Sequence, residues 1–260
     1  ITWYSGVPTM HQAILMRAKK NPKLAEELSL RFIRSSSASL PPAVFDELKK
    51  IFKTTVIEAY GMTEATHQMT SNPMPPEKQK AGFVGKPAGP EVCIMDAQGN
   101  ILDSGVDGEV CIRGDNVTNG YENNEEANKT AFINGWFRTG DQGHFDDEGY
   151  LKISGRLKEI INRGGEKVSP LEVDNILMEH EAVEQVVTFA VKDNLLGEAI
   201  GVAIVLKSGV DCNEIDIKNY ASKHLADFKI PKYIRLLEEI PKGATGKLQR
   251  IGLAEKLGLE

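Results

Sequence analysis

The sequence has no excess of positive charge and no long apolar run. Its 260 residues include 31 Lys and Arg against 37 Asp and Glu, a net charge of −6, and the basic residues form no stripe. Nucleic acid is therefore not an expected partner. The longest apolar segment, residues 199–206, is long enough only for a strand, whereas a membrane-spanning helix needs roughly 20 residues. We expect no membrane span.

Cysteine is scarce, and the first residues show no signal-like pattern. Cys93, Cys111 and Cys212 are odd in number and far apart in sequence, which fits neither a disulfide framework nor Cys-x-x-Cys metal spacing. We therefore expect buried free thiols in a reducing compartment. The chain ends in Gly-Leu-Glu and not in a peroxisomal signal of the Ser-Lys-Leu type, so the cytoplasm is the expected location. The chain starts at Ile1 without an initiator Met or a signal-like segment, so we expect it to be part of a longer protein.

The first part of the chain alternates between helix and strand patterns. Helical periodicity marks residues 8–19 and 41–52, and short strands are expected at 30–33 and 55–59. This alternation predicts a parallel α/β sheet, here in partial form. Short apolar segments separated by Gly, Asp and Asn turns then predict a small antiparallel β unit, with strands at 92–95, 108–112 and 150–153.

A second domain, small and of α+β type, is predicted after residue 157. Ser169 and Glu172 have the spacing of a capping box and Pro170 suits the first helical position, so a helix should run to about residue 179. We place the two domains at 1–157 and 158–260. The later pattern predicts strands at 183–191, 199–206 and 233–238 and a helix at 213–226.

The pentapeptide 60–64, Tyr-Gly-Met-Thr-Glu, follows a predicted strand. The carboxyl end of a strand is the usual place for ligands in open α/β sheets. A tyrosine can stack on a purine, a threonine hydroxyl can bond a phosphate oxygen, and a carboxylate can hold Mg²⁺. The alternative interpretation of this pentapeptide is an ordinary strand-to-loop turn.

Residues 138–141, Arg-Thr-Gly-Asp, supply a second carboxylate. Asp141 can accept hydrogen bonds from both hydroxyls of a ribose, although an aspartate after glycine is also a common turn residue. Arg156 brings a permanently charged fork that suits ribose or phosphate oxygens, and its alternative interpretation is a solvated surface arginine.

The segment 241–247, Pro-Lys-Gly-Ala-Thr-Gly-Lys, is not a phosphate-binding P-loop. That pattern needs a glycine where Pro241 stands and a hydroxyl where Leu248 stands. A flexible turn that ends in a single lysine can instead carry the Lys247 ammonium into a site built by another part of the chain.

In this order and spacing the motifs resemble the C-terminal half of an adenylate-forming acyl-CoA synthetase, of the superfamily that includes firefly luciferase and the adenylation domains of peptide synthetases. The resemblance covers essentially the whole chain. Within the superfamily, residues 58–73 and 162–170 most closely resemble the oxalate–CoA ligases. The matching segments are 36–40, 60–64, 137–141, 155–158, 162–167 and 241–247.

The resemblance implies a reaction in two halves that uses ATP, Mg²⁺ and coenzyme A. A carboxylate attacks the α-phosphorus of ATP to give acyl-AMP and pyrophosphate, and the thiol of coenzyme A then attacks the acyl carbon and expels AMP. By resemblance, Thr63 bonds phosphate, Glu64 positions Mg²⁺, and Lys247 stabilises charge shared by the substrate carboxylate and the α-phosphate. The other nucleotide contacts that it implies are Ser37, Ala38, Ser39, Tyr60, Gly61, Met62, Asp141 and Arg156.

Further roles follow from the mobile small domain of this superfamily. Lys158 matches the hinge about which that domain rotates between the half-reactions. Gly164 and Gly165 match the wall of the pantetheine tunnel, where a side chain would block the thiol arm, with a plain hairpin turn as the alternative. We assign His67 to the far carboxylate of oxalate, against the alternative of a surface or core histidine.

The superfamily's loop for the β- and γ-phosphates is absent and would lie upstream of Ile1. We therefore expect these 260 residues alone not to form acyl-AMP at a useful rate, and to need the missing N-terminal half. The alternative substrate is malonate or a short- or medium-chain acid. The alternative class is a non-catalytic acyl-AMP-binding or carrier-loading module.

Overall fold

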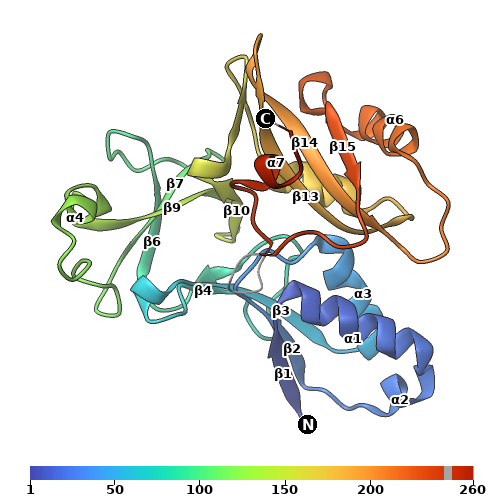
Figure 1. Ribbon diagram of the computed structural model, residues 1–260. Coiled ribbons are helices and arrows are strands. Elements are labelled where there is room, and N and C mark those ends of the chain that lie inside the picture. Colours follow the sequence, from blue (N-terminus) through green and yellow to red (C-terminus); the bar gives the residue numbers. More distant parts are fainter. Residues whose placement is uncertain (243–247, 260) are drawn as a thin grey trace. The chain divides into compact units, whose positions relative to one another are not determined.

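A parallel sheet opens the chain in the computed structural model, which describes residues 1–242 and 248–259. Strands β1 (Trp3–Gly6), β2 (Phe32–Ser35) and β3 (Thr55–Tyr60) run parallel to one another (Figure 1). Two short strands, β4 (Thr70–Ser71) and β5 (Lys86–Pro87), continue this sheet with antiparallel pairing. The predicted α/β class is confirmed for this part of the chain.

Helices α1 (Pro8–Lys20), α2 (Pro22–Glu27) and α3 (Pro42–Phe52) connect the parallel strands, and each begins with a proline. Proline suits the first turn because its fixed φ is helical and its missing N–H has no acceptor there. The buried residues Val44, Phe45, Leu48 and Phe52 form one face of α3, the spacing that predicted it. Both predicted helices are confirmed, whereas β1 and α2 are additional, and the strand predicted at 30–33 begins two positions later.

A second sheet follows within the same unit. Strands β6 (Glu91–Met95), β7 (Gly108–Arg113), β9 (Trp136–Phe145) and β10 (Leu151–Arg156) lie in the order β10-β9-β7-β6. β8 (Phe132–Ile133) pairs with β9, and α4 (Glu125–Ala131) precedes it. Ile112 and Phe137 of this sheet share a buried cluster with Met69, so the sheet packs against the turn after β3.

The second unit has an α+β arrangement, as predicted. The chain divides into Ile1–Ser154 and Gly155–Glu260, close to the boundary predicted after residue 157. The strands are β11 (Ile161–Arg163), β12 (Glu166–Val168), β13 (Val183–Asp193), β14 (Gly197–Leu206) and β15 (Tyr233–Leu236), in the order β12-β11-β14-β13 with β15 parallel to β14. The helices are α5 (Pro170–Met178), α6 (Glu214–His224) and α7 (Leu253–Lys256).

Helix caps explain where the two longer helices of this unit begin. The Ser169 hydroxyl accepts the Glu172 N–H, as the predicted cap requires. The complete capping box is at α6, where Asn213 and Asp216 each accept the backbone N–H of the other. Two apolar clusters fill the interior of the unit: one is formed by α5, α6 and the sheet, and the other joins Val187 and Phe189 of β13 to Leu253 of α7.

The three cysteines are free, but two of them are neighbours. Cys93 on β6 lies directly opposite Cys111 on β7. Burial raises the pKa of the Cys93 thiol to about 11 and that of Cys111 to about 12, so both stay protonated at neutral pH. Cys212 is half-buried, and the expectation that all three are buried was wrong for it.

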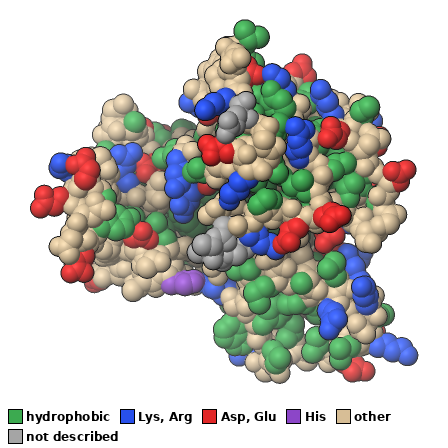
Figure 2. Space-filling model, viewed as in Figure 1, with side chains coloured by type: hydrophobic (Ala, Val, Ile, Leu, Met, Phe, Trp, Pro, Cys, Tyr) green, Lys and Arg blue, Asp and Glu red, His purple; other side chains and the backbone are tan. Residues whose placement is uncertain are grey.

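Charge and hydropathy agree with the composition. Acidic and basic side chains are interspersed on the face that Figure 2 shows, in line with the small net charge of −6. Within the described part of the chain, none of the helices has the length and apolarity needed to cross a bilayer.

Candidate nucleotide site

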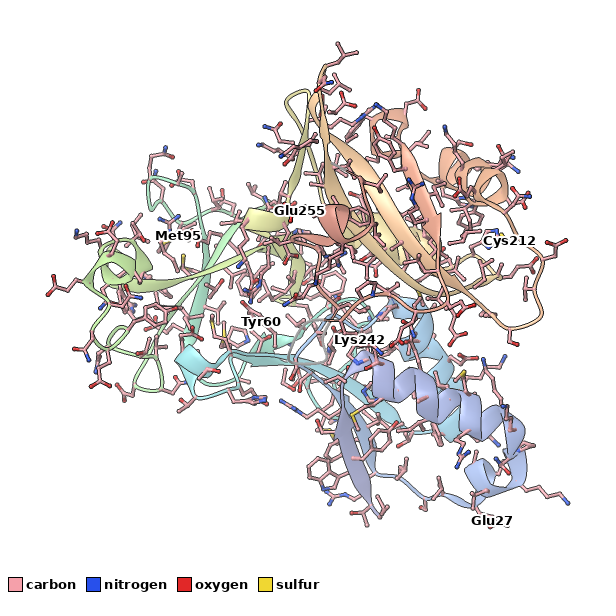
Figure 3. All side chains as sticks on the ribbon, in the orientation of Figure 1. Glu27, Tyr60, Met95, Cys212, Lys242 and Glu255 are labelled. Atoms are coloured by element: carbon pink, nitrogen blue, oxygen red, sulfur yellow. The ribbon has the colours of Figure 1, made fainter. Side chains whose placement is uncertain are left out.

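Tyr60 and Asp141 meet although 81 positions separate them in the chain, because the Tyr60 hydroxyl donates a hydrogen bond of 2.5 Å to Asp141 Oδ2. Tyr60, labelled in Figure 3, is the last residue of β3, and Asp141 lies in the middle of β9. The bond joins the two sheets of the first unit. It also holds the tyrosine ring at its hydroxyl end as well as at its backbone.

The segment around Asp141 owes its shape to Glu109 on the neighbouring strand. Glu109 accepts hydrogen bonds from the Arg138 guanidinium at 2.7 Å and from the Gly140 N–H at 3.0 Å. Gly140 has φ +72°, and the β7–β9 pairing shifts register at this point. The Thr139 hydroxyl accepts the Asp141 N–H at 3.1 Å and donates to a carbonyl of β7. Arg138 thus pairs with Glu109, and Asp141 is the residue of this segment that contacts Tyr60.

The turn after β3 is tightly closed at Gly61. A Cβ at this position would lie 1.4 Å from the backbone oxygen of His67, so only glycine fits. The His67 N–H donates to the Met62 carbonyl at 3.0 Å, and the Met69 N–H donates to that of Tyr60 at 2.9 Å. His67 has φ +84° and its side chain is exposed. His67 is therefore a surface residue and not a core histidine. An exposed side chain is compatible with the substrate role, which stays a prediction.

Thr63 and Glu64 lie in a single turn of 3₁₀-helix, Thr63–Ala65. Glu64 Oε1 accepts a hydrogen bond of 2.9 Å from the Tyr121 hydroxyl, and burial, followed by this bond, raises the pKa of Tyr121. Thr63 is exposed. Among the residues that the structure describes, no three or more acidic, His or Cys side chains cluster into a metal site. One carboxylate suits Mg²⁺ that takes its other ligands from phosphates and water.

The loop 36–40 is fixed at its ends and exposed in its middle. Ser36 is buried and its hydroxyl accepts a hydrogen bond of 2.9 Å from Arg34, while the Leu40 N–H donates to Glu58 Oε1 at 2.9 Å. Between these anchors, Ser37, Ala38 and Ser39 are exposed, and Ser37 has φ +72°. The three predicted adenine contacts are therefore the accessible part of the loop.

Arg34 belongs to none of the sequence motifs, and Glu58, although it begins the segment 58–73, was given no role from the sequence. Glu58 is 1% exposed, and burial raises the pKa of its carboxyl to about 8, opposed by the Leu40 N–H. Both residues sit in short parallel strands beside the motifs. A charged residue within a four- to six-residue strand was the available signal, because such strands are normally apolar.

The remaining predicted residues belong to the second unit. Arg156 ends β10, Lys158 lies in the 3₁₀-turn Leu157–Glu159, and both side chains are exposed. Gly164 and Gly165 form the turn between β11 and β12, with φ +63° and +97°. These angles confirm the hairpin interpretation, and the pantetheine role stays a prediction. Lys247 lies outside the described residues, and a bridge between Lys242 and Leu248 flanks it.

Comparison with known proteins agrees with this organisation. A model of the AMP-binding enzyme family matches residues 1–122, and a model of the AMP-binding enzyme C-terminal domain matches residues 172–247. The oxalate–CoA ligase of Arabidopsis thaliana is 52% identical over 96% of this chain and 48% of its own length. The oxalate–CoA ligase of Saccharomyces cerevisiae is 50% identical over 97% of this chain and 46% of its own length.

Solved structures show the same fold. ATP-bound MatB from Rhodopseudomonas palustris superposes with a TM-score of 0.90 at 30% identity, covering 98% of this chain and 50% of that protein. The anthranilate–CoA ligase AuaEII, in complex with anthranoyl-AMP, gives 0.87 at 31% identity, covering 98% and 49%. The chain thus spans about half the length of the relatives it matches. With both family models matched, one in each unit, the chain belongs to the AMP-binding, adenylate-forming enzyme family.

Proposed function

We propose that this chain works as part of an ATP-dependent, AMP-forming acid–CoA ligase that acts on oxalate or another small carboxylic acid. The observation that carries the proposal is the bond between Tyr60 and Asp141 beside the closed turn at Gly61. This bond brings Tyr60, which we propose stacks on adenine, next to Asp141, which we propose binds the ribose, and the closed turn leads directly into Thr63 and Glu64. The 52% identity to the Arabidopsis oxalate–CoA ligase supports the same assignment.

In the first half-reaction, a substrate carboxylate oxygen bonds to the α-phosphorus of ATP as the bond to pyrophosphate breaks. Tyr60 stacks on adenine, Asp141 and Arg156 hold the ribose, and the exposed residues 37–39 border the base. Thr63 bonds a phosphate oxygen, and Glu64 is the protein ligand for Mg²⁺, which neutralises phosphate charge. Lys247 stabilises the negative charge that the carboxylate and the α-phosphate share in the transition state.

In the second half-reaction, the sulfur of coenzyme A bonds to the acyl carbon and AMP leaves with the electron pair of the broken C–O bond. Gly164 and Gly165 leave room for the pantetheine arm because neither carries a side chain. Lys158 acts as the hinge residue between the half-reactions. His67 binds the far end of the acid.

The test is pyrophosphate release with Mg-ATP and coenzyme A by a chain extended to the length of its relatives, with oxalate, malonate, acetate and octanoate in parallel. Strong preference for oxalate supports the substrate assignment. Preference for another acid keeps the ligase mechanism and discards oxalate. No release with any acid contradicts the ligase proposal and favours a binding module.

Two controls sharpen this assay. Omitting coenzyme A should leave one round of pyrophosphate release and stop AMP release, whereas AMP release to a carrier protein alone would indicate carrier loading. His67→Ala should raise the KM for oxalate and spare that for ATP. An unchanged KM for oxalate would remove His67 from the substrate site.

A further inference from the structure

Arg34 is a half-buried cation whose hydrogen-bond partners are all neutral. Its guanidinium donates to Ser36 Oγ at 2.9 Å, to Gln68 Oε1 at 3.3 Å and to Ser5 Oγ at 3.3 Å. Within residues 1–242 and 248–259 it has no carboxylate within ion-pair distance. Burial lowers the pKa of Arg34, which reflects the cost of keeping its charge here.

The other half-buried cations of the first unit are paired. Arg138 forms an ion pair of 2.6 Å with Glu109, and Lys80 forms ion pairs of 2.5 Å with Asp146 and 2.8 Å with Glu148. A partly desolvated charge without a counter-charge is costly, and proteins normally satisfy it with an opposite charge. Arg34 is the exception in this unit, which points to an anion from outside the described residues.

The contacts of Arg34 place it between the two loops of the candidate site. Ser36 begins the loop 36–40, and Gln68 directly follows His67 in the turn closed by Gly61. β2, which carries Arg34, is parallel to β3, so this is the carboxyl-end region of the sheet where ligands bind in such folds. An anion at Arg34 would therefore lie next to the residue proposed for the acid's far end.

We infer that Arg34 is the specificity-determining residue of the acyl site, and that it binds the distal carboxylate of a small dicarboxylic acid. This inference rests on the proposed ligase function and deepens it. A guanidinium matches a carboxylate with two parallel hydrogen bonds, and a neutral acid of the same size would leave the cation unpaired. Phosphate oxygens of the nucleotide have the same chemistry, so the experiment separates the two sources.

The experiment compares Arg34→Gln, Arg34→Lys and the control Arg31→Gln in the extended chain. Arg31 is exposed and makes no side-chain hydrogen bond within the described residues, while Gln at position 34 keeps a hydrogen-bond donor and loses the charge. Each variant is assayed with oxalate and with oxamate, which is nearly the same size but has a neutral far end. The readouts are kcat/KM for each acid and the KM for ATP.

We expect Arg34→Gln to lower kcat/KM for oxalate by roughly 100-fold, because an unpaired charge then remains on the substrate. Oxamate should lose less than about threefold, the KM for ATP should stay within about twofold, and Arg34→Lys should recover part of the oxalate activity. Arg31→Gln should match the wild type. Equal losses with both acids, or a raised KM for ATP with every acid, would overturn the inference and place Arg34 at a phosphate or in the fold.

Two outcomes separate this inference from the proposed function. A wild type that prefers a neutral acid keeps the ligase and contradicts the role of Arg34. If no acid supports pyrophosphate release, titration calorimetry with oxalate in the presence of AMP decides: binding that Arg34→Gln abolishes supports the anion site, and absent or unchanged binding overturns it.

Discussion

Each unit of the chain buries a carboxylate, and the two are stabilised in opposite ways. Glu58 in the first unit accepts the Leu40 N–H, and its other oxygen is buried without a partner within the described residues. Asp174 in the second unit forms an ion pair of 2.7 Å with Arg250 and accepts the Thr188 N–H at 2.7 Å. Burial raises the pKa of both carboxyls, and only for Asp174 does a cation oppose the rise.

The two carboxyl groups differ in protonation state and in the segment of the chain that each one anchors. Glu58 has its proton in the native state near neutral pH and anchors a loop that borders the candidate site. Asp174 keeps a charged partner, and Arg250 in turn reaches Glu159 at 3.3 Å, in the turn that contains Lys158. The second unit therefore ties its C-terminal segment to its first turn by ion pairs, while in the first unit the neutral Glu58 carboxyl holds the Leu40 end of the loop 36–40.

The largest effect is expected from breaking the charged pair. Arg250→Met leaves Asp174 buried without its cation, which should lower the free energy of unfolding of the second unit by about 3–5 kcal/mol. Urea denaturation of the extended chain, followed by hydrogen exchange in β13, measures this. The destabilisation comes from the Asp174 carboxylate, which is left buried without a cation. Adding Asp174→Leu removes that carboxylate and should therefore restore part of the stability. A double variant as unstable as the sum of the single ones would contradict the explanation.

The neutral carboxyl should make the first unit sensitive to pH. The pKa of Glu58 is about 8 in the folded state against an ordinary value of 4.5, so the folded form binds more protons and its stability falls as pH rises through this window. We expect a loss of about 2–4 kcal/mol between pH 5 and 8. Glu58→Gln should flatten the profile, and the exposed control Glu122→Gln should keep it. A profile unchanged by Glu58→Gln would assign the pH dependence elsewhere.

A smaller effect is expected from Tyr60→Phe, which removes one hydrogen bond from the buried Asp141 and keeps the ring. The free energy of unfolding should fall by about 1–2 kcal/mol. The ring would no longer be held at its outer end, so the affinity for AMP, measured by calorimetry, should also fall. The control is Phe137→Leu, which should lower AMP affinity less for each kcal/mol of stability that it costs. Unaltered AMP affinity would argue that the hydroxyl bond does not prepare the ring for stacking.

The smallest effect on stability is expected from Gly165→Ala, which can distinguish a structural from a functional role of the β11–β12 turn. At Gly165 a Cβ would meet open space, but φ is +97°, so Gly165→Ala should cost only about 1 kcal/mol of stability. If this turn lines the pantetheine tunnel, the variant should slow AMP release by coenzyme A and leave pyrophosphate release unchanged. Equal slowing of both half-reactions would contradict the tunnel assignment.

Much of the fold could be predicted because local signals were strong. Proline at the first position and a regular apolar face specify α3, and long apolar stretches specify β13 and β14. β1 has four residues of which only Gly6 is buried, so it carries no pattern. β9 was missed because Arg138, Gly140 and Asp141 interrupt its alternation, and these are the residues that build the site.

The candidate site was less predictable than its motifs. Tyr60 and Asp141 could each be proposed from local sequence, but their bond depends on the pairing of two sheets. Likewise, Cys93 and Cys111 are distant in sequence and adjacent across β6 and β7. For Arg34 the sequence offers only a charged residue within a short strand, whereas the lack of a charged partner depends on its three-dimensional surroundings.

The closed turn at Gly61 has a practical consequence for altering substrate choice. A Cβ at position 61 would lie 1.4 Å from the His67 carbonyl oxygen. Most variants in a library at this position would therefore have to change the conformation of the turn. Thr66 and His67 also have positive φ, +48° and +84°, so many substitutions there would strain the same turn, whereas Gln68 has no positive φ. Directed evolution of acid preference would therefore start from the codon of Gln68, with Gly61 kept constant.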